Sequence, residues 1–283
     1  MSSRQKPMNT DYTTPQAWET YTPEEHARWS LLHKRQIEML RGRACSEFMD
    51  GLTALDLNAG GIPNFDKLSE SLHKLTSWTV VAVPHLAPDA VFFEHLANRR
   101  FPAGRFIRSE RQLDYLQEPD VFHDVFGHVP MLVNPAFADF MQAYGEAGVR
   151  SLSFDCLDLL ARLYWYTVEF GLIRTAEGLR IYGSGIVSSY AESKFALENP
   201  SPNRIAFNMQ RIMRTDFRID DFQQTYFVVD SFERLLREVR KDFSGLYRAL
   251  ANETTLTPMD VLPDDTVLTH GTQDYALRKS ERL

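Results

Sequence analysis

Two histidines in the segment 119–130 are the first residues whose types and spacing suggest chemistry. The segment reads PDVFHDVFGHVP, so His123 and His128 lie five residues apart. Neutral imidazole is a common metal ligand, but on a regular α-helix side chains five apart diverge by roughly 140°. The two histidines can therefore share a metal only if the helix stops between them, and Gly127 and Pro130 are placed to stop it. By itself, the spacing fits two unrelated histidines at a helix end equally well.

A carboxylate in an apolar segment strengthens the case for a metal. The segment 157–170 predicts a core helix, and Glu169 lies near its C-terminal end. An ionised carboxylate there costs on the order of several kcal/mol unless a cation or a metal neutralises it. Arg162, seven residues earlier on the same face, offers a buried ion pair as the alternative. Two histidines and one carboxylate can hold Fe(II) with open coordination positions or a catalytic zinc, so the spacing does not choose the metal.

Aromatic residues and one arginine surround these segments. Core packing explains most of the rings, although a flat heteroaromatic ligand would need at least one exposed ring to stack on. Arg108 can hold a substrate carboxylate with two hydrogen bonds, or pair at the surface with Glu110 or Asp120. The run Gly183–Gly185 lacks the pattern of a phosphate-binding loop, which argues against nucleotide binding.

The composition excludes several classes of protein. The chain has 283 residues, of which 43% are hydrophobic and 24% charged, as in folded globular proteins. Its 31 Lys and Arg against 38 Asp and Glu give a net charge of −7, so the basic character of a nucleic-acid-binding protein is missing. No window reaches the roughly 18 consecutive apolar residues of a membrane helix. We expect a cytoplasmic protein that binds small molecules, not nucleic acid or membranes, with Cys45 and Cys156 as reduced thiols.

Periodicity predicts a mainly α fold with a small minor β-sheet. Helical patterns dominate, and no alternation of strands and helices typical of a parallel α/β sheet is present. The first twenty residues are polar and predict a flexible N-terminal arm on the surface. The helices are expected over 23–49, 65–75, 89–98, 110–127, 133–149, 156–170, 203–213 and 230–241, and the strands over 78–83, 179–182 and 225–229.

Three strings resemble the pterin-dependent aromatic amino acid hydroxylases. They are YLQEPDVFHDVFGHVP at 115–130, ARLYWYTVEFG at 161–171 and IYGSGIVSS at 181–189, in the order of the family. The resemblance implies a single catalytic domain over 21–243, after an arm at 1–20, with 244–283 as a C-terminal extension packed on it or trailing it. No regulatory domain fits before this domain, and no heptad run follows it. A monomer or weak dimer is therefore expected.

The resemblance also implies the occupants of the site. His123, His128 and Glu169 correspond to the ligands of Fe(II). Tetrahydropterin and O₂ are the implied cosubstrates. The implied pterin-binding residues are Leu86, Phe92, Asp124, Ala161 and Tyr164, with the pterin stacked on Phe92. The implied substrate-binding residues are Arg108, Pro119, Asp120, Trp165 and Ser188, with Arg108 meeting the substrate carboxylate and Asp120 holding that arginine.

The implied reaction is hydroxylation of L-phenylalanine at ring carbon C4 to give L-tyrosine, in phenylalanine catabolism or tyrosine formation. The same chemistry on tryptophan or tyrosine is the nearest alternative, and a zinc-dependent hydrolase with the same ligands is an alternative of another class. Three positions depart from the animal members of the family. His85 and Asp89 replace Gly and Ser in the pterin loop, and Leu116 replaces a hydroxyl residue near the substrate.

Overall fold

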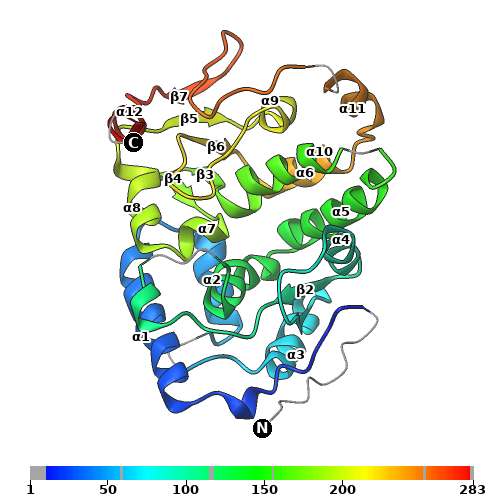
Figure 1. The fold of residues 1–283 in the computed structure, drawn as a ribbon, viewed down its shortest axis with the longest axis vertical. Coiled ribbons are helices and arrows are strands. Elements are labelled where there is room, and N and C mark those ends of the chain that lie inside the picture. The colour runs from blue at the N-terminus through cyan, green and yellow to red at the C-terminus, as the bar shows by residue number, and fades with distance from the viewer. Residues whose placement is uncertain (1–10, 58–59, 115–117, 155, 251–252, 281–283) are drawn as a thin grey trace.

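Helices make up most of the fold, and a small sheet lies at one end of the molecule (Figure 1). The computed structural model describes residues 11–57, 60–114, 118–154, 156–250 and 253–280. The α-helices are α1 (Pro23–Leu40), α2 (Ser46–Ala54), α3 (Phe65–Thr76), α4 (Asp89–Ala97), α5 (Pro135–Ser151), α6 (Leu157–Tyr164), α7 (Ser184–Val187), α8 (Tyr190–Glu198), α9 (Met209–Met213), α10 (Phe232–Val239), α11 (Ser244–Leu250) and α12 (Asp274–Ser280). The short 3₁₀ helices are η1 (Trp18–Thr20), η2 (Glu110–Gln112) and η4 (Val129–Val133), and the π-helices are η3 (Phe122–His128) and η5 (Trp165–Glu169).

Five strands form the main sheet, in the order β4-β3-β6-β5-β7. The strands are β1 (Thr79–Ala82), β2 (Arg100–Ala103), β3 (Leu172–Thr175), β4 (Gly178–Ile181), β5 (Asn203–Ala206), β6 (Thr225–Val229) and β7 (Val267–Thr269). The central strand β6 is buried along its whole length and pairs in parallel with β3 and β5, whereas β4 and β7 are antiparallel at the edges. Strands β1 and β2 form a separate parallel pair. The predicted mainly α fold with a small sheet is confirmed.

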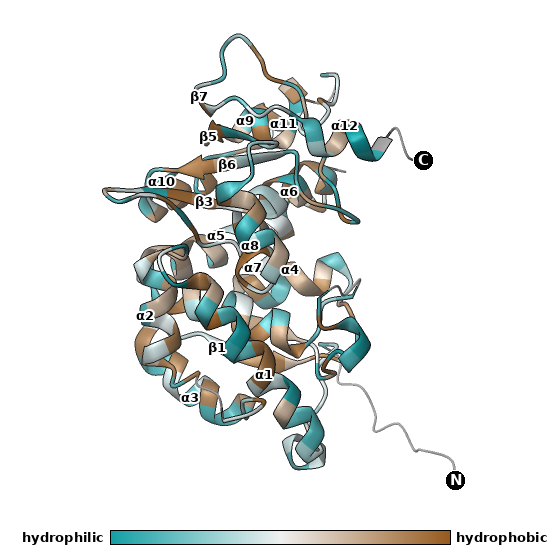
Figure 2. Cartoon of the chain, turned by 90° about the vertical axis from the view of Figure 1, so that its left-hand side faces the viewer, coloured by the Kyte–Doolittle hydropathy of each residue, from teal (hydrophilic) through white to brown (hydrophobic). Residues whose placement is uncertain are grey.

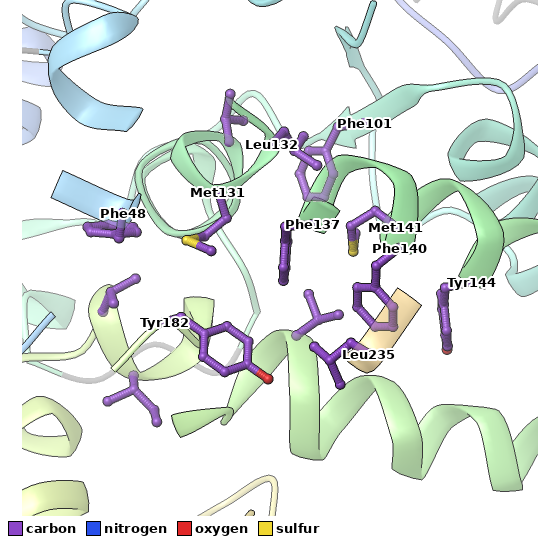
Figure 3. Packing of buried hydrophobic residues seen from close by; sticks show 14 of the residues in the cluster. Phe48, Phe101, Met131, Leu132, Phe137, Phe140, Met141, Tyr144, Tyr182 and Leu235 are labelled. Carbon is purple, nitrogen blue, oxygen red and sulfur yellow. The ribbon is translucent and has the colours of Figure 1, made fainter. Parts of the chain in front are cut away.

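One apolar core runs through the molecule. Helices α1, α2 and α3 lie at one end, the sheet lies at the other, and α5 and α6 cross between them (Figure 1). Phe137 and Phe140 of α5 point toward Tyr182 and Leu235, which come from the sheet side and from α10 (Figure 3). Hydrophobic residues gather where the elements face one another, and polar residues cover the outside of helices such as α1 and α12 (Figure 2). The core therefore joins both ends of the fold around α5.

The helix expected over 23–49 is two helices. Its start is as predicted, because Thr22 caps α1 and Glu25 completes a capping box. The helix ends at Leu40, before Gly42, whose φ of +70° lies in the left-handed region. The backbone of 43–45 then hydrogen-bonds to both the N–H and the carbonyl of Ile181, at 2.8 and 2.9 Å. This pairing with the end of β4 replaces a turn of helix.

Two other predicted helices are also wrong in part. The described residues of 110–127 form η2 and most of η3 instead of one helix, and a proline at 119 disfavours helix in the residue before it. Over 203–213 the first four residues form β5 between β6 and β7, and the helix α9 begins only after Asn208, whose side chain caps it. Strands β2, β3, β5 and β7 were not predicted.

Both ends of the described chain lie against the domain. Residues 11–21 hydrogen-bond to the end of β1, to residues 62–65 and to Arg105. In the C-terminal part, β7 pairs with β5, and Asp265 forms a buried ion pair with Arg211 at 3.1 Å. Among the described residues, no helix combines the length and the apolar character that crossing a membrane requires. No disulfide joins Cys45 and Cys156.

Candidate active site

Two histidines and one glutamate bring their ligand atoms together in the interior. One ligand atom each from His123, His128 and Glu169 lies within 4.8 Å of the other two. The two Nε2 atoms are 3.2 Å apart, and the Glu169 carboxylate oxygens lie 3.1 Å from His128 Nε2 and 3.6 Å from His123 Nε2. We refer to these three residues as the triad. Of the described residues, they form the group of His, Cys, Asp and Glu side chains that is able to hold a metal ion.

Two π-helices aim these side chains. The helix does not stop between His123 and His128, as the sequence suggested, but widens into η3. In a π-helix the hydrogen bonds run between residues five apart, so this spacing brings both side chains to the same side of the helix, unlike in an α-helix. Glu169 is the last residue of the second π-helix, η5, which is closed by a bond from the Phe170 N–H to the Trp165 carbonyl at 2.8 Å.

Neighbouring hydroxyl groups orient two members of the triad. Ser188 Oγ lies 2.9 Å from His123 Nδ1, so the hydroxyl fixes the ring and leaves Nε2 facing the other ligands. Ser184 Oγ donates to the Glu169 carboxylate at 2.9 Å. Both serines are buried and belong to the turn around α7. A Cβ on Gly183, just before this turn, would lie 2.4 Å from the Glu169 carbonyl oxygen, so the close approach requires glycine here.

Burial and neighbouring groups set the protonation states of His123 and Glu169. Burial lowers the pKa of His123 to about 4, so this imidazole is neutral at pH 7 and its Nε2 lone pair is free to bind a metal. Burial opposes ionisation of Glu169, but the adjacent histidines and the Ser184 hydroxyl outweigh it and hold the pKa of this carboxyl below its usual value. The alternative of an ion pair between Glu169 and Arg162 is wrong, since Arg162 pairs with aspartates at 158 and 216.

Asp124 lies beside the triad and is held by the backbone. Gly104 donates its N–H to Asp124 Oδ2 at 2.7 Å. Burial raises the pKa of Asp124 to about 7, although the Gly104 bond works in the opposite direction. This carboxyl group therefore exchanges a proton near neutral pH, in contrast to the ionised Glu169.

Arg108 and Asp120 form a buried ion pair next to the triad, rather than a surface pair. Arg108 Nε and Nη2 donate to the two carboxylate oxygens of Asp120, each at 2.9 Å, and the Arg108 N–H adds a third bond at 2.8 Å. Asp120 also accepts the N–H of His123 at 3.0 Å. The guanidinium lies over the ring of Phe122, 5.6 Å from its centroid. One carboxylate thus links the arginine to the start of the metal-binding helix.

An aromatic wall borders His128. Its ring stacks against Tyr164 at 6.2 Å between centroids and lies 4.9 Å from Phe101. Phe92 of α4 packs edge-on against Tyr164 at 5.6 Å and is only half-buried, which leaves ring surface accessible. Leu86 is 68% exposed.

A second group of rings lies on the other side of η5. Trp165 stacks on Phe217, with ring centroids 4.4 Å apart, and contacts Phe170 at 5.0 Å. Its Nε1 is buried without a hydrogen-bond partner among the described residues. Pro119 is half-buried, and its carbonyl lies 3.8 Å from the point where a Cβ on Gly104 would stand.

The remaining expected positions are less closely connected. Ala161, one turn before Tyr164 on α6, is exposed. Of the three departures from the family pattern, His85 is exposed, Asp89 begins α4, and Leu116 lies outside the described residues.

The structure adds residues that the sequence analysis missed. Ser184 and Gly104 hold the two carboxylates, Phe101 and Phe217 extend the aromatic groups, and each comes from outside the two strings that carry the triad. Ser184 stands in the string at 181–189, where a hydroxyl beside a glycine was the available signal. No such signal in the sequence marks Gly104, Phe101 or Phe217, because their contacts depend on the tertiary fold.

Comparison with known proteins identifies the class to which this fold and this triad belong. The sequence profile of the biopterin-dependent aromatic amino acid hydroxylases matches residues 6–273, so the chain belongs to that family. The resemblance drawn from the three strings is thereby confirmed.

Individual relatives share one name. The chain is 62% identical over 266 residues to a phenylalanine-4-hydroxylase of Caulobacter vibrioides, covering 94% of this chain and 90% of the relative. It is 55% identical to the phenylalanine-4-hydroxylase of Chromobacterium violaceum, covering 92% of this chain and 88% of that protein. A crystal structure of the latter enzyme with iron and phenylalanine bound superposes with a TM-score of 0.88, at 52% identity, over 92% of this chain and 94% of that one.

Proposed function

We propose that this chain is a phenylalanine 4-monooxygenase, which hydroxylates L-phenylalanine to L-tyrosine with O₂ and a tetrahydropterin at a non-heme Fe(II). The observation that carries the proposal is the buried triad, whose three ligand atoms lie within 4.8 Å of one another in a member of the hydroxylase family. The relatives named phenylalanine-4-hydroxylase support phenylalanine as the substrate.

The donor set fits iron. Two imidazoles and one carboxylate on one face form the facial triad that binds Fe(II) and leaves positions open. The carboxylate of Glu169, only 9% exposed, has no Lys or Arg partner among the described residues, so a dication supplies the missing positive charge. When bound, iron and the pterin together supply the activated oxygen.

The protein's own residues bind, orient and exclude water. We assign the substrate carboxylate to Arg108, which Asp120 holds in position, and the rest of the amino acid backbone to Ser188. Pro119 and Trp165 are assigned to the substrate ring. Because Trp165 packs against two other rings, it presents a rigid surface, and a fixed ring position places one carbon for reaction.

The pterin is assigned to the side of the triad that carries Phe92 and Tyr164. The half-buried Phe92 ring offers a stacking surface, and Asp124, which accepts the Gly104 N–H, offers a carboxyl group beside the triad. Leu86 and Ala161 complete the assignment as exposed borders of the same site. The proposal includes a catalytic domain over 21–243, a cytoplasmic location and a monomer or weak dimer.

The decisive experiment measures tyrosine formed from phenylalanine with and without Fe(II) and tetrahydropterin. We expect product only when both are present. The variant Glu169→Ala should lose stoichiometric iron and product formation, because it removes one of three protein ligands. Glu192→Gln is the matched control, since Glu192 is an equally buried glutamate that bonds to Tyr226 instead of the triad. Near-normal iron content in Glu169→Ala would refute the assigned site.

Two further measurements separate the alternatives. Initial rates on phenylalanine, tryptophan and tyrosine test the substrate, and faster turnover of either of the last two would overturn phenylalanine. Hydrolytic activity with zinc, together with no hydroxylation with Fe(II) and pterin, would establish the zinc hydrolase instead.

A further inference from the structure

Residues 11–21 lie along the domain and include the 3₁₀ helix η1; we call this segment the N-terminal strap. Thr14 donates its N–H to the carbonyl of Ala82 at the end of β1, at 2.9 Å. Trp18 Nε1 donates to the carbonyl of Ile62 at 2.7 Å. The strap is thus tied to the backbone at separate points along its length.

The last residue of the strap reaches toward the site. The hydroxyl of Tyr21 donates to the carbonyl of Arg105 at 2.5 Å, and Arg105 Nη1 donates back to the carbonyl of Pro15 at 3.1 Å. Tyr21 is half-buried, and it also packs edge-on against His26. Two hydrogen bonds in opposite directions therefore fix one residue of the segment 104–108 to the strap.

That segment carries two groups of the active site. The N–H of Gly104 holds Asp124 at 2.7 Å, and Arg108 forms the buried pair with Asp120. The strap holds the carbonyl of Arg105, which lies one residue after Gly104 and three residues before Arg108. Since so short a stretch has few free dihedral angles, a shift of this carbonyl moves the base of Arg108.

We propose that Tyr21 is a positioning residue for substrate binding, because its hydrogen bond to Arg105 sets where Arg108 presents its guanidinium to the substrate carboxylate. This inference rests on the proposed function, which assigns that carboxylate to Arg108. The hydroxyl of Tyr21 touches neither substrate nor metal, and it acts through the backbone of 104–108.

The test is Tyr21→Phe, which removes the hydroxyl and keeps the ring. In the Fe(II)-loaded enzyme with tetrahydropterin, we expect the KM for phenylalanine, and its Kd by calorimetry, to rise about two- to tenfold, the worth of one hydrogen bond. The kcat should stay within about twofold, because saturating substrate restores the bound geometry. In the metal-free protein, hydrogen exchange of the amides at 104–108 should become faster.

Trp18→Phe is the matched control. It removes a side-chain bond of the same kind from the same strap, but one that ends on Ile62. We expect wild-type KM and wild-type exchange at 104–108 in this variant. Should Tyr21→Phe fail to fold, Arg105→Met removes the reciprocal bond to Pro15 and is expected to raise the KM in the same way.

Two results would overturn the inference. One is unchanged phenylalanine affinity and unchanged exchange at 104–108 in the variant at Tyr21 or at Arg105. The other is an equal rise of KM in Trp18→Phe, which would indicate general loosening of the strap. Failure of the proposed function is a separate result, since it appears as absent phenylalanine turnover in the wild type, while the exchange measurement still decides the role of Tyr21.

Discussion

The buried pair of Arg108 and Asp120 permits a quantitative test of how the active site is held together. Asp120 is fully buried, and its two oxygens accept four hydrogen bonds, three from Arg108 and one from the His123 N–H. Asp120→Ala leaves the guanidinium, which is only 6% exposed, without a counter-charge. Removing one partner of a buried ion pair costs about 3–5 kcal/mol, so we expect the unfolding free energy to fall by that amount.

The double variant isolates the interaction. Arg108→Met removes the charge and keeps an apolar stem, and alone it should also cost about 3–5 kcal/mol because the buried carboxylate of Asp120 is left unpaired. Combined with Asp120→Ala, it leaves no unpaired charge. The double variant should therefore be more stable than the sum of the two losses implies, with a coupling energy of about 2–3 kcal/mol.

Urea unfolding of the metal-free protein measures these energies, because no ligand then contributes to stability. The control is the exposed pair of Arg35 and Asp114, whose aspartate side chain is 79% exposed. Asp114→Ala should cost no more than about 1 kcal/mol. Losses at Arg108 and Asp120 that add to within about 0.5 kcal/mol would refute the reasoning, since the two charges would then not depend on one another.

Two further predictions concern metal affinity and pH. Ser188→Ala frees the ring of His123 and should lower Fe(II) affinity about 10–100-fold in a titration. Ser193 is a buried serine that bonds to backbone carbonyls, so Ser193→Ala should leave the affinity unchanged. Equal affinities of the two variants would contradict the role of Ser188. Burial raises the pKa of Glu192 from 4.5 to about 7. Between these two pH values the folded state binds a proton that the unfolded state releases. The contribution of Glu192 to stability therefore falls as pH rises through this window, by at most about 1.4 kcal/mol per pH unit. In urea unfolding at pH 5 to 8, the unfolding free energy of Glu192→Gln should fall less with pH than that of the wild type. An unchanged slope would contradict the raised pKa of Glu192.

The sequence predicted the triad because its three residues lie in continuous strings. His123, His128 and Glu169 stand in two of them, and the pair of Arg108 and Asp120 followed from the resemblance to the family. These assignments needed only the identity of residues at fixed positions. They did not need the path of the chain between the strings.

The sequence did not predict features that depend on contacts between distant segments. The break between α1 and α2 depends on hydrogen bonds to Ile181, and β5 is a strand because β6 and β7 pair with it on both sides. Both stretches have helical periodicity, and tertiary pairing overrides such local preference. The same holds for Gly104 and Tyr21, whose partners are far away along the chain.

The wide turn of η3 has a consequence for how this site can change. Inserting or deleting one residue between His123 and His128 would break the spacing of five residues that the π-helical turn needs, so the two imidazoles would no longer lie on the same side. A substitution between them keeps that spacing, but Val125 and Phe126 are fully buried and need apolar side chains. Length and composition are therefore both constrained in this segment, and natural variation here should keep the number of residues and the apolar side chains at Val125 and Phe126.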